Sequence, residues 1–120
     1  MAQFSNKYDL EERTATFGEL IIDFCKGVRQ DAITKSIINQ LVRSGTSVGA
    51  NYMEANAASS KKDFRNKIYI CKKEAQETKH WLRMIARCVS DKKDEISKLW
   101  NEARELTLIF QKITSSLNEN

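Results

Sequence analysis

The chain has 120 residues, 41% of them hydrophobic, with four Gly and no Pro, which is typical of one folded helical domain and excludes a disordered chain. Its net charge is +4. Cys25, Cys71 and Cys88 lack C-x-x-C spacing, so we expect reduced thiols, no disulfide, no metal site and no cofactor. No apolar run approaches the ~18 residues of a membrane helix, and the first ten residues lack a signal peptide's apolar core. We therefore expect a soluble cytoplasmic protein with no membrane partner.

Two helices are predicted in the first half of the chain, over about residues 10–27 and 32–57, because apolar residues recur there at alternating steps of four and three. Asp9 is expected to cap the first helix and Gly27 to end it. The predicted core positions of the first helix are Leu10, Thr14, Phe17, Ile21, Phe24 and Val28. Those of the second are Ile38, Leu41, Gly45, Val48, Tyr52 and Ala55.

Two longer helices are predicted in the second half, over about residues 61–89 and 92–117, with Ser60 and Asp91 as N-caps. The core positions of the third are Phe64, Ile68, Cys71, Ala75, Thr78, Leu82, Ile85 and Val89. Those of the fourth are Ile96, Leu99, Ala103, Leu106, Phe110, Ile113 and Leu117. The short connections predict an all-α, up-down-up-down antiparallel four-helix bundle that forms a single domain over residues 1–120.

The segment RSGTSVGANYMEANAA, residues 43–58, places several residues that weaken a helix inside the second helix. An interior Gly costs about 1 kcal/mol relative to Ala, so Gly45 and Gly49 need a compensating contact. Together they make a flat strip one turn long, against which another backbone can approach closely. Arg43 is expected to form an ion pair with one of the carboxylates of Glu54, Glu74 and Glu77. Asn51 is expected to form a hydrogen bond with the backbone.

A second line on the third helix also alternates by four and three, and consists of Ile70, Glu74, Glu77, Trp81, Met84 and Cys88. A monomeric bundle is expected to leave this line uncovered, which favours burial of Trp81 and Met84 between subunits. The alternative is that Trp81 covers the edge of its own core.

The segments RSGTSVGANYMEANAASSKKDF and KKEAQETKHWLRMI resemble the four-helix-bundle family also called 23S rRNA-intervening-sequence proteins, some of which are encoded inside insertions in ribosomal RNA genes. The resemblance implies an up-down bundle that assembles into a ring-like homopentamer. A relative serves as the accessory subunit of a retroelement reverse transcriptase. The positions matching the family motif are Arg43, Ser44, Gly45, Ser47, Gly49, Asn51, Glu54, Ala55, Phe64, Glu74, Ala75, Glu77, Trp81 and Leu82. None is an established catalytic residue.

Catalytic signals are weak in this sequence. Glu77-x-x-His80 has the spacing used by carboxylate bundles that bind two irons, but those bundles need a second such motif and the chain has one His. The sequence also has no Ser/His/Asp set, phosphate-binding Gly loop or dinucleotide fingerprint. We therefore expect no catalytic residue and no enzyme, and elemental analysis would test the metal-enzyme alternative.

Basic charge is concentrated between Lys61 and Lys93, where eleven Lys or Arg face four Asp or Glu, a net charge of +7. Arg65, Lys72 and Lys79 recur every seven residues and form a column on one flank of the helix. The predicted nucleic-acid-binding residues are Lys61, Lys62, Arg65, Lys72, Lys73, Lys79, Arg83 and Arg87. The alternative is that these cations only keep the protein soluble.

The predicted function is a non-catalytic homo-oligomeric scaffold that binds RNA or DNA through this basic face. The competing function is an adaptor for a protein partner such as a nucleic-acid enzyme, as the reverse-transcriptase relative suggests. The predicted interface and motif residues are Arg43, Gly45, Gly49, Asn51, Glu54, Glu74, Glu77 and Trp81.

Overall fold

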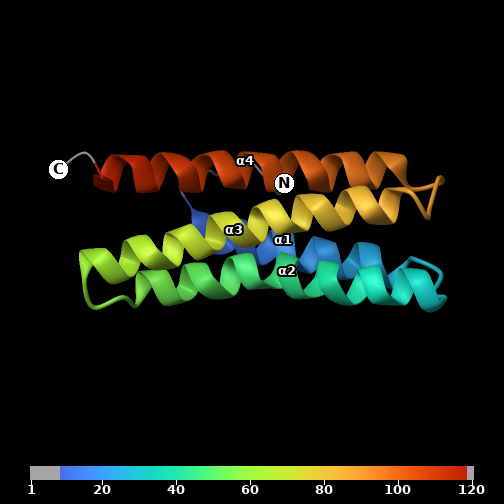
Figure 1. Cartoon of the computed structure of the whole chain (residues 1–120), viewed down its shortest axis with the longest axis horizontal. Helices are drawn as coiled ribbons and strands as arrows, with labels where there is room; N and C mark the ends of the chain where they lie inside the picture. The colour runs from blue at the N-terminus through green and yellow to red at the C-terminus, as the bar shows by residue number, and fades with distance from the viewer. Residues whose placement is uncertain (1–8, 119–120) are drawn as a thin grey trace.

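The computed structural model describes residues 9–118 and contains four α-helices and no strand within that range (Figure 1). The helices are α1, Leu10–Lys26; α2, Ala32–Asn56; α3, Lys61–Ala86; and α4, Lys93–Asn118. The prediction of an all-α chain with four helices is confirmed.

Local hydrogen bonds at the helix starts explain why the helices begin where they do. The side chain of Asp9 accepts a bond of 3.1 Å from the backbone N–H of Glu12, and Ser60 accepts one of 3.0 Å from the N–H three residues later. Asp31 forms a capping box with Thr34, in which each side chain accepts a bond from the other's backbone N–H. These side chains satisfy N–H groups that have no partner within their own helix.

The helix ends differ slightly from the predicted ones. Gly27 is the C-cap of α1, as expected, and its N–H donates to the carbonyl of Phe24. Regular helix in α3 stops at Ala86 rather than at Val89, yet the N–H of Val89 still donates to the carbonyl of Ile85 at 3.2 Å. That bond and the partial burial of Val89 explain why its side chain follows the core periodicity past the end of the helix. α4 begins at Lys93, so Asp91 is not the residue directly before it.

The four helices pack into an elongated bundle with extents of 48 × 31 × 21 Å (Figure 1). α2 and α3 make the largest contact, followed by α3 with α4 and α1 with α2, whereas α1 meets α4 through far fewer residues. The loops at 27–31 and 87–92 lie at one end of the bundle and the loop at 57–60 lies at the other (Figure 1). α3 therefore lies between α2 and α4, with one flank toward each.

The core is built from the predicted positions of all four helices. Its fully buried large side chains are Phe17, Ile21, Leu41, Val48, Ile68, Leu82, Ile85, Leu106 and Phe110. Removal of this apolar surface from water is the main driving force for folding. Among the described residues, no helix is both long enough and apolar enough to cross a membrane.

A buried ion pair links α1 to α4. The guanidinium of Arg13 donates two bonds of 2.7 Å to the carboxylate of Glu102, and a third of 3.1 Å to Glu105. Arg13 and Glu102 are 4% and 2% exposed, so the pair is removed from solvent. The hydrogen bonds to Glu102 raise the pKa of Arg13 above its ordinary value. A buried charge left without its partner is strongly destabilising, so this pair fixes how α1 lies on α4.

Candidate functional site

The seam between α2 and α1 is built from glycines, and it is the close contact predicted for the strip at Gly45 and Gly49. A Cβ at Gly45 would lie 2.9 Å from Cγ1 of Ile21, and a Cβ at Gly49 would lie 3.3 Å from the backbone carbonyl of Thr14. Gly18 of α1 faces the same seam, where a Cβ would lie 3.4 Å from Cα of Thr46. The predicted close approach is confirmed, and it joins two helices of one chain.

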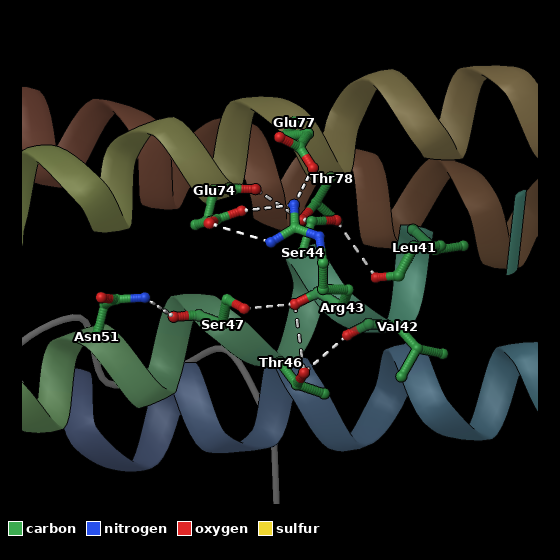
Figure 2. A network of polar contacts seen from close by, with 10 residues as sticks. All are labelled: Leu41, Val42, Arg43, Ser44, Thr46, Ser47, Asn51, Glu74, Glu77 and Thr78. Carbon is green, nitrogen blue, oxygen red and sulfur yellow. Dashed lines mark hydrogen bonds and ion pairs between the residues drawn. The ribbon is translucent and has the colours of Figure 1, made fainter. Parts of the chain in front are cut away.

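The seam between α2 and α3 is held by ion pairs (Figure 2). Arg43 donates from Nη2 to Oε1 of Glu74 at 3.1 Å and from Nη1 to Oε2 at 3.3 Å, and it also pairs with Glu77. The Glu74 side chain is 9% exposed and that of Arg43 is 46% exposed, so the pair closes the edge of the core. The bonds to Glu74, and then those to Glu77, raise the pKa of Arg43. The predicted pairing of Arg43 is confirmed.

The small polar residues of the motif bond mainly to backbone near them (Figure 2). Asn51 donates to the carbonyl of Ser47 at 2.8 Å, as expected, and Ser47 donates to the carbonyl of Arg43 at 2.6 Å. The hydroxyl of Thr78 on α3 donates to that of Ser44 at 3.0 Å across the seam. These side chains are short enough to satisfy themselves locally, which leaves room for the neighbouring helix.

Glu54 extends the ionic seam toward the end of α2. Its carboxylate accepts a bond of 2.7 Å from Nζ of Lys67 on α3. Among the eleven Lys and Arg residues from Lys61 to Lys93, Lys67 is the one that forms an ion pair with a carboxylate within residues 9–118. The motif thus divides between two seams, with Gly45 and Gly49 toward α1 and the charged residues toward α3.

The second line on α3 is covered largely by the chain itself. Ile70, Glu77, Trp81 and Met84 are partly buried and Glu74 is buried, while Cys88 is exposed. Trp81 packs against the core, and its Nε1 is buried with no hydrogen-bond partner within residues 9–118. The expectation that a monomer leaves this line uncovered is wrong, because Trp81 packs against the core of its own chain and Arg43 of α2 reaches across to the two glutamates of the line. The alternative, that Trp81 covers the edge of its own core, is the one observed.

The predicted basic column lies along the seam between α3 and α4. Arg65 donates from Nη1 to Oδ1 of Asn118 at 3.2 Å, and Lys72 donates to the side-chain oxygen of Gln111. Nζ of Lys79 lies 4.7 Å from the ring centroid of Trp100, which is a cation–π contact. All three side chains are half-buried, and their partners are neutral.

The remaining cations predicted to bind nucleic acid are exposed, and they are Lys61, Lys62, Lys73, Arg83 and Arg87. Within residues 9–118, none of the eight predicted cations forms an ion pair with a carboxylate. The carboxylates of Glu74 and Glu77 lie on the opposite flank of α3, where Arg43 holds them. α3 has 26 residues and is ~39 Å long, so its outer face is a long positive strip. We call this strip, formed by the eight cations, the basic face.

The residues weighed as metal ligands, Glu77 and His80, each contact another side chain. Glu77 of the Glu77-x-x-His80 pair is bound by Arg43, and the His80 ring is exposed and packs edge-on against Trp81. Among the described residues, no group of three or more His, Cys, Asp or Glu could hold a metal ion. Burial raises the pKa of Cys25 to about 11 and that of Cys71 to about 12, so both remain protonated near neutral pH.

A groove on the outer side of α1 and α2 was not predicted from the sequence. It has a volume of about 590 Å³, and its apolar walls are Ala15, Ile22, Ala50 and Met53. Glu11, Glu12 and Glu19 also line it, and none of the described lining residues is Lys or Arg. Met53 is 61% exposed, so an accessible apolar side chain lies in a groove that is also lined by carboxylates. The spacing of Glu11, Ala15 and Ile22 on one face of α1 was the available sequence signal.

Comparison with known proteins agrees with this geometry. The sequence model of the family described as 23S rRNA-intervening sequence protein matches residues 6–117. A solved structure from Bacteroides thetaiotaomicron VPI-5482, described as a protein with unknown function from the S23 ribosomal protein family, has a TM-score of 0.76 and 30% sequence identity to this chain. The similarity covers 88% of this chain and 97% of that one. Among curated proteins, none matches. The match over nearly the whole length, together with the four-helix fold, shows that the chain belongs to the 23S rRNA-intervening sequence protein family.

Proposed function

We propose that this protein is a non-catalytic cytoplasmic scaffold that binds RNA or DNA through the basic face of α3. The observation that carries the proposal is the separation of charge around this helix. Glu74 and Glu77 form ion pairs with Arg43 on the α2 flank, whereas none of the eight cations of the basic face has a carboxylate partner within residues 9–118. A positive surface whose cations are not paired with carboxylates attracts phosphates, and binding gains free energy from counterion release.

The half-buried column is suited to hold phosphates at fixed spacing. Gln111 and Asn118 bind Lys72 and Arg65 through neutral oxygens, so they orient the cations without cancelling their charge. The exposed cations beside them add charge that is less fixed in position. Recognition of this kind reads the nucleic-acid backbone and is weakly selective in base sequence.

The test is binding of a structured RNA, measured by electrophoretic shift at several salt concentrations. Two variants each reverse three charges of the basic face, and a third reverses three exposed charges elsewhere as a matched control. The first variant changes Arg65, Lys72 and Lys79 to Glu. The second changes Lys73, Arg83 and Arg87 to Glu. The control changes Lys26, Lys35 and Lys98 to Glu.

Both basic-face variants are expected to weaken binding strongly at low salt and to reduce the salt slope of log affinity by about 0.7 to 0.9 for each phosphate that is no longer bound. The control carries the same change in net charge and is expected to bind much more tightly than either. Helicity and melting must be measured for all three, because the column residues also contact α4. Equal binding by the folded variants and the parent would show that the basic face only solubilises the protein.

We also infer that the helices run up-down-up-down and that the bundle assembles into a homo-oligomer, a pentamer as the family resemblance implies. The placement of successive loops at alternate ends of the bundle supports the antiparallel order (Figure 1). Exposed large apolar side chains, including Met53 and Leu108, support burial between copies. Light scattering is expected to give several times the chain mass of 13.8 kDa. A monomer at micromolar concentration would contradict the assembly.

The groove between α1 and α2 favours a second function, as an adaptor for a protein partner. Its apolar walls and the carboxylates of Glu11, Glu12 and Glu19 fit an amphipathic helix flanked by Lys or Arg. A synthetic helical peptide with a Leu face and Lys flanks is expected to bind the parent, and to bind poorly to Met53→Lys. Ile33→Lys is the matched control, since Ile33 is exposed to a similar degree, 67% against 61% for Met53, but is not among the residues lining the groove. Equal peptide binding by both variants would contradict binding of the peptide in the groove.

A further inference from the structure

Tyr69 is an exposed aromatic residue in the middle of the basic face. Its side chain is 41% exposed, although large apolar side chains are mostly buried in this chain. On a helix the residues three and four positions away share a face, and for Tyr69 these include Arg65, Lys72 and Lys73. The ring of Tyr69 therefore lies beside cations on the helix surface and is not part of the hydrophobic core.

The ring is held in place by an amide that also holds one of the cations. Asn118, the last residue of α4, donates from Nδ2 to the hydroxyl of Tyr69 at 3.1 Å. Its Oδ1 accepts the bond of 3.2 Å from Nη1 of Arg65. One side chain from another helix therefore fixes a phenol and a guanidinium one turn apart. Such a fixed arrangement lowers the entropy lost when a ligand contacts both groups.

We infer that Tyr69, Arg65, Lys72 and Lys73 form a site for one unpaired nucleotide, with its base stacked on the tyrosine ring and its phosphates on the cations. The inference rests on the proposed function and adds to it a contact that only single-stranded nucleic acid can make. Proteins that bind single strands combine a positive path for the backbone with aromatic rings for the bases. In a duplex the bases are stacked on one another and are not available to Tyr69.

A purely structural role for Tyr69 is the competing explanation, since its hydroxyl bonds to the end of α4. Three substitutions separate the two roles. Tyr69→Phe keeps the ring and removes the hydrogen bond, whereas Tyr69→Leu keeps apolar bulk and removes the aromatic face. Tyr69→Ala removes both. A structural role predicts that Phe is as harmful as Leu, and stacking predicts that Phe is tolerated.

The experiment measures the affinity of each full-length variant for a short single-stranded RNA and for a duplex of the same sequence, by fluorescence anisotropy across a salt series. Tyr69→Leu and Tyr69→Ala are expected to bind the single strand about tenfold more weakly, because the base has no ring on which to stack. Their salt slopes are expected to match the parent's, because the cations still bind the same phosphates. Binding of the duplex is expected to be unchanged, and Tyr69→Phe to stay near the parent.

A fluorescent adenine analogue in the single strand gives a direct readout of stacking. Its emission is expected to fall on binding to the parent and to Tyr69→Phe, and to fall less with Tyr69→Leu. Unchanged single-strand affinity of a folded Tyr69→Leu, or an equal loss for the duplex, would overturn the inference while leaving the basic face intact. If the parent binds neither RNA, the proposed function itself fails, and the nucleotide site fails with it.

Discussion

α2 contacts its two neighbours through seams of opposite character. Toward α1 the seam consists of Gly45, where an added Cβ would overlap Ile21, and Gly49, where it would press on the Thr14 backbone. Toward α3 it consists of Arg43 and Glu54, which form ion pairs with charged side chains of that helix.

The difference between the seams shows how one short motif serves two purposes. The glycine seam depends on shape, and close-packed interiors respond strongly to a change of even one methylene. The ionic seam depends on charge at a partly exposed edge, where water and salt weaken each interaction. Substitutions in the glycine seam should therefore cost more stability than substitutions in the ionic seam.

Gly45→Leu tests the glycine seam most severely. We expect the free energy of unfolding to fall by about 3 kcal/mol, because the site is buried and the Ile21 side chain fills the space. Urea unfolding followed by circular dichroism measures the change. Ala50→Leu is the matched control on an exposed position of the same helix and should change stability little. A Gly45→Leu protein as stable as the parent would contradict the contact with Ile21.

Gly49→Leu should cost less, about 2 kcal/mol. Its Cβ would press on the Thr14 backbone, which moves less readily than a side chain, but the position is partly exposed and the rest of the Leu can reach solvent. Better helix propensity offsets the loss by about 1 kcal/mol at most. Differential scanning calorimetry is the measurement. An unchanged or raised melting temperature would refute close packing at this end of the seam.

Arg43→Ala tests the ionic seam, and we expect the free energy of unfolding to fall by about 1 kcal/mol because the Arg43 side chain is 46% exposed. Double-mutant cycles should give a larger coupling for Arg43 with Glu74 than with Glu77, about 1 against about 0.3 kcal/mol, since Glu74 is the more buried carboxylate. High salt should reduce both coupling energies, because it screens partly exposed charges. Equal couplings, or a loss as large as that of Gly45→Leu, would remove the distinction between the seams.

The alkylation rates of the cysteines are expected to show the smallest effect. They measure how often a seam opens locally, even where the free energy of unfolding changes little. Cys71 donates its thiol to the carbonyl of Val48 on α2 at 3.6 Å, so it lies within the ionic seam, and Cys88 is exposed. Alkylation followed by mass spectrometry should modify Cys88 first and Cys71 slowly. In Arg43→Ala the rate at Cys71 should rise more than the rate at Cys25. Rapid modification of all three thiols in the parent would contradict the burial.

The thiols also give a pH dependence with a defined sign. Burial raises the pKa of Cys71 to about 12 in the fold, whereas an unfolded thiol ionises near its ordinary value of 9.0. The unfolded chain therefore loses its proton first as pH rises. The contribution of Cys71 to the free energy of unfolding should be constant below pH 9 and should fall as the pH rises above 9. Replacement of Cys71 by Ala should flatten this alkaline decrease, which thermal melting between neutral and alkaline pH would measure.

Much of the fold could be predicted because it depends on local rules. The alternation of four and three placed the four helices within a few residues of their ends, and Asp9, Ser60 and Gly27 act as caps through atoms three residues away. A carboxylate partner for Arg43 was expected because a partly buried charge needs one, but that Glu74 and Glu77 are the partners came only from the structure.

The partners that the sequence did not reveal are far apart along the chain. Arg13 meets Glu102 across 89 positions, and Tyr69 meets Asn118 across 49. Gly18 interrupts the apolar pattern beside Phe17, but its contact with α2 depends on how the two helices are rotated. The predicted exposure of the second line on α3 failed for the same reason, since periodicity does not reveal which neighbour covers a flank.

The sequence alone determined that this protein has four amphipathic helices, a small-residue segment in α2 and a concentration of cations in α3, because each of these depends on neighbours within about two turns. Only the tertiary structure decided that the glycines face α1 while the motif charges face α3. It also placed Arg65, Lys72 and Lys79 of α3 toward α4, where their partners are neutral. The physical reason is that helix order and rotation are set by packing of all four apolar faces together, which no single segment encodes.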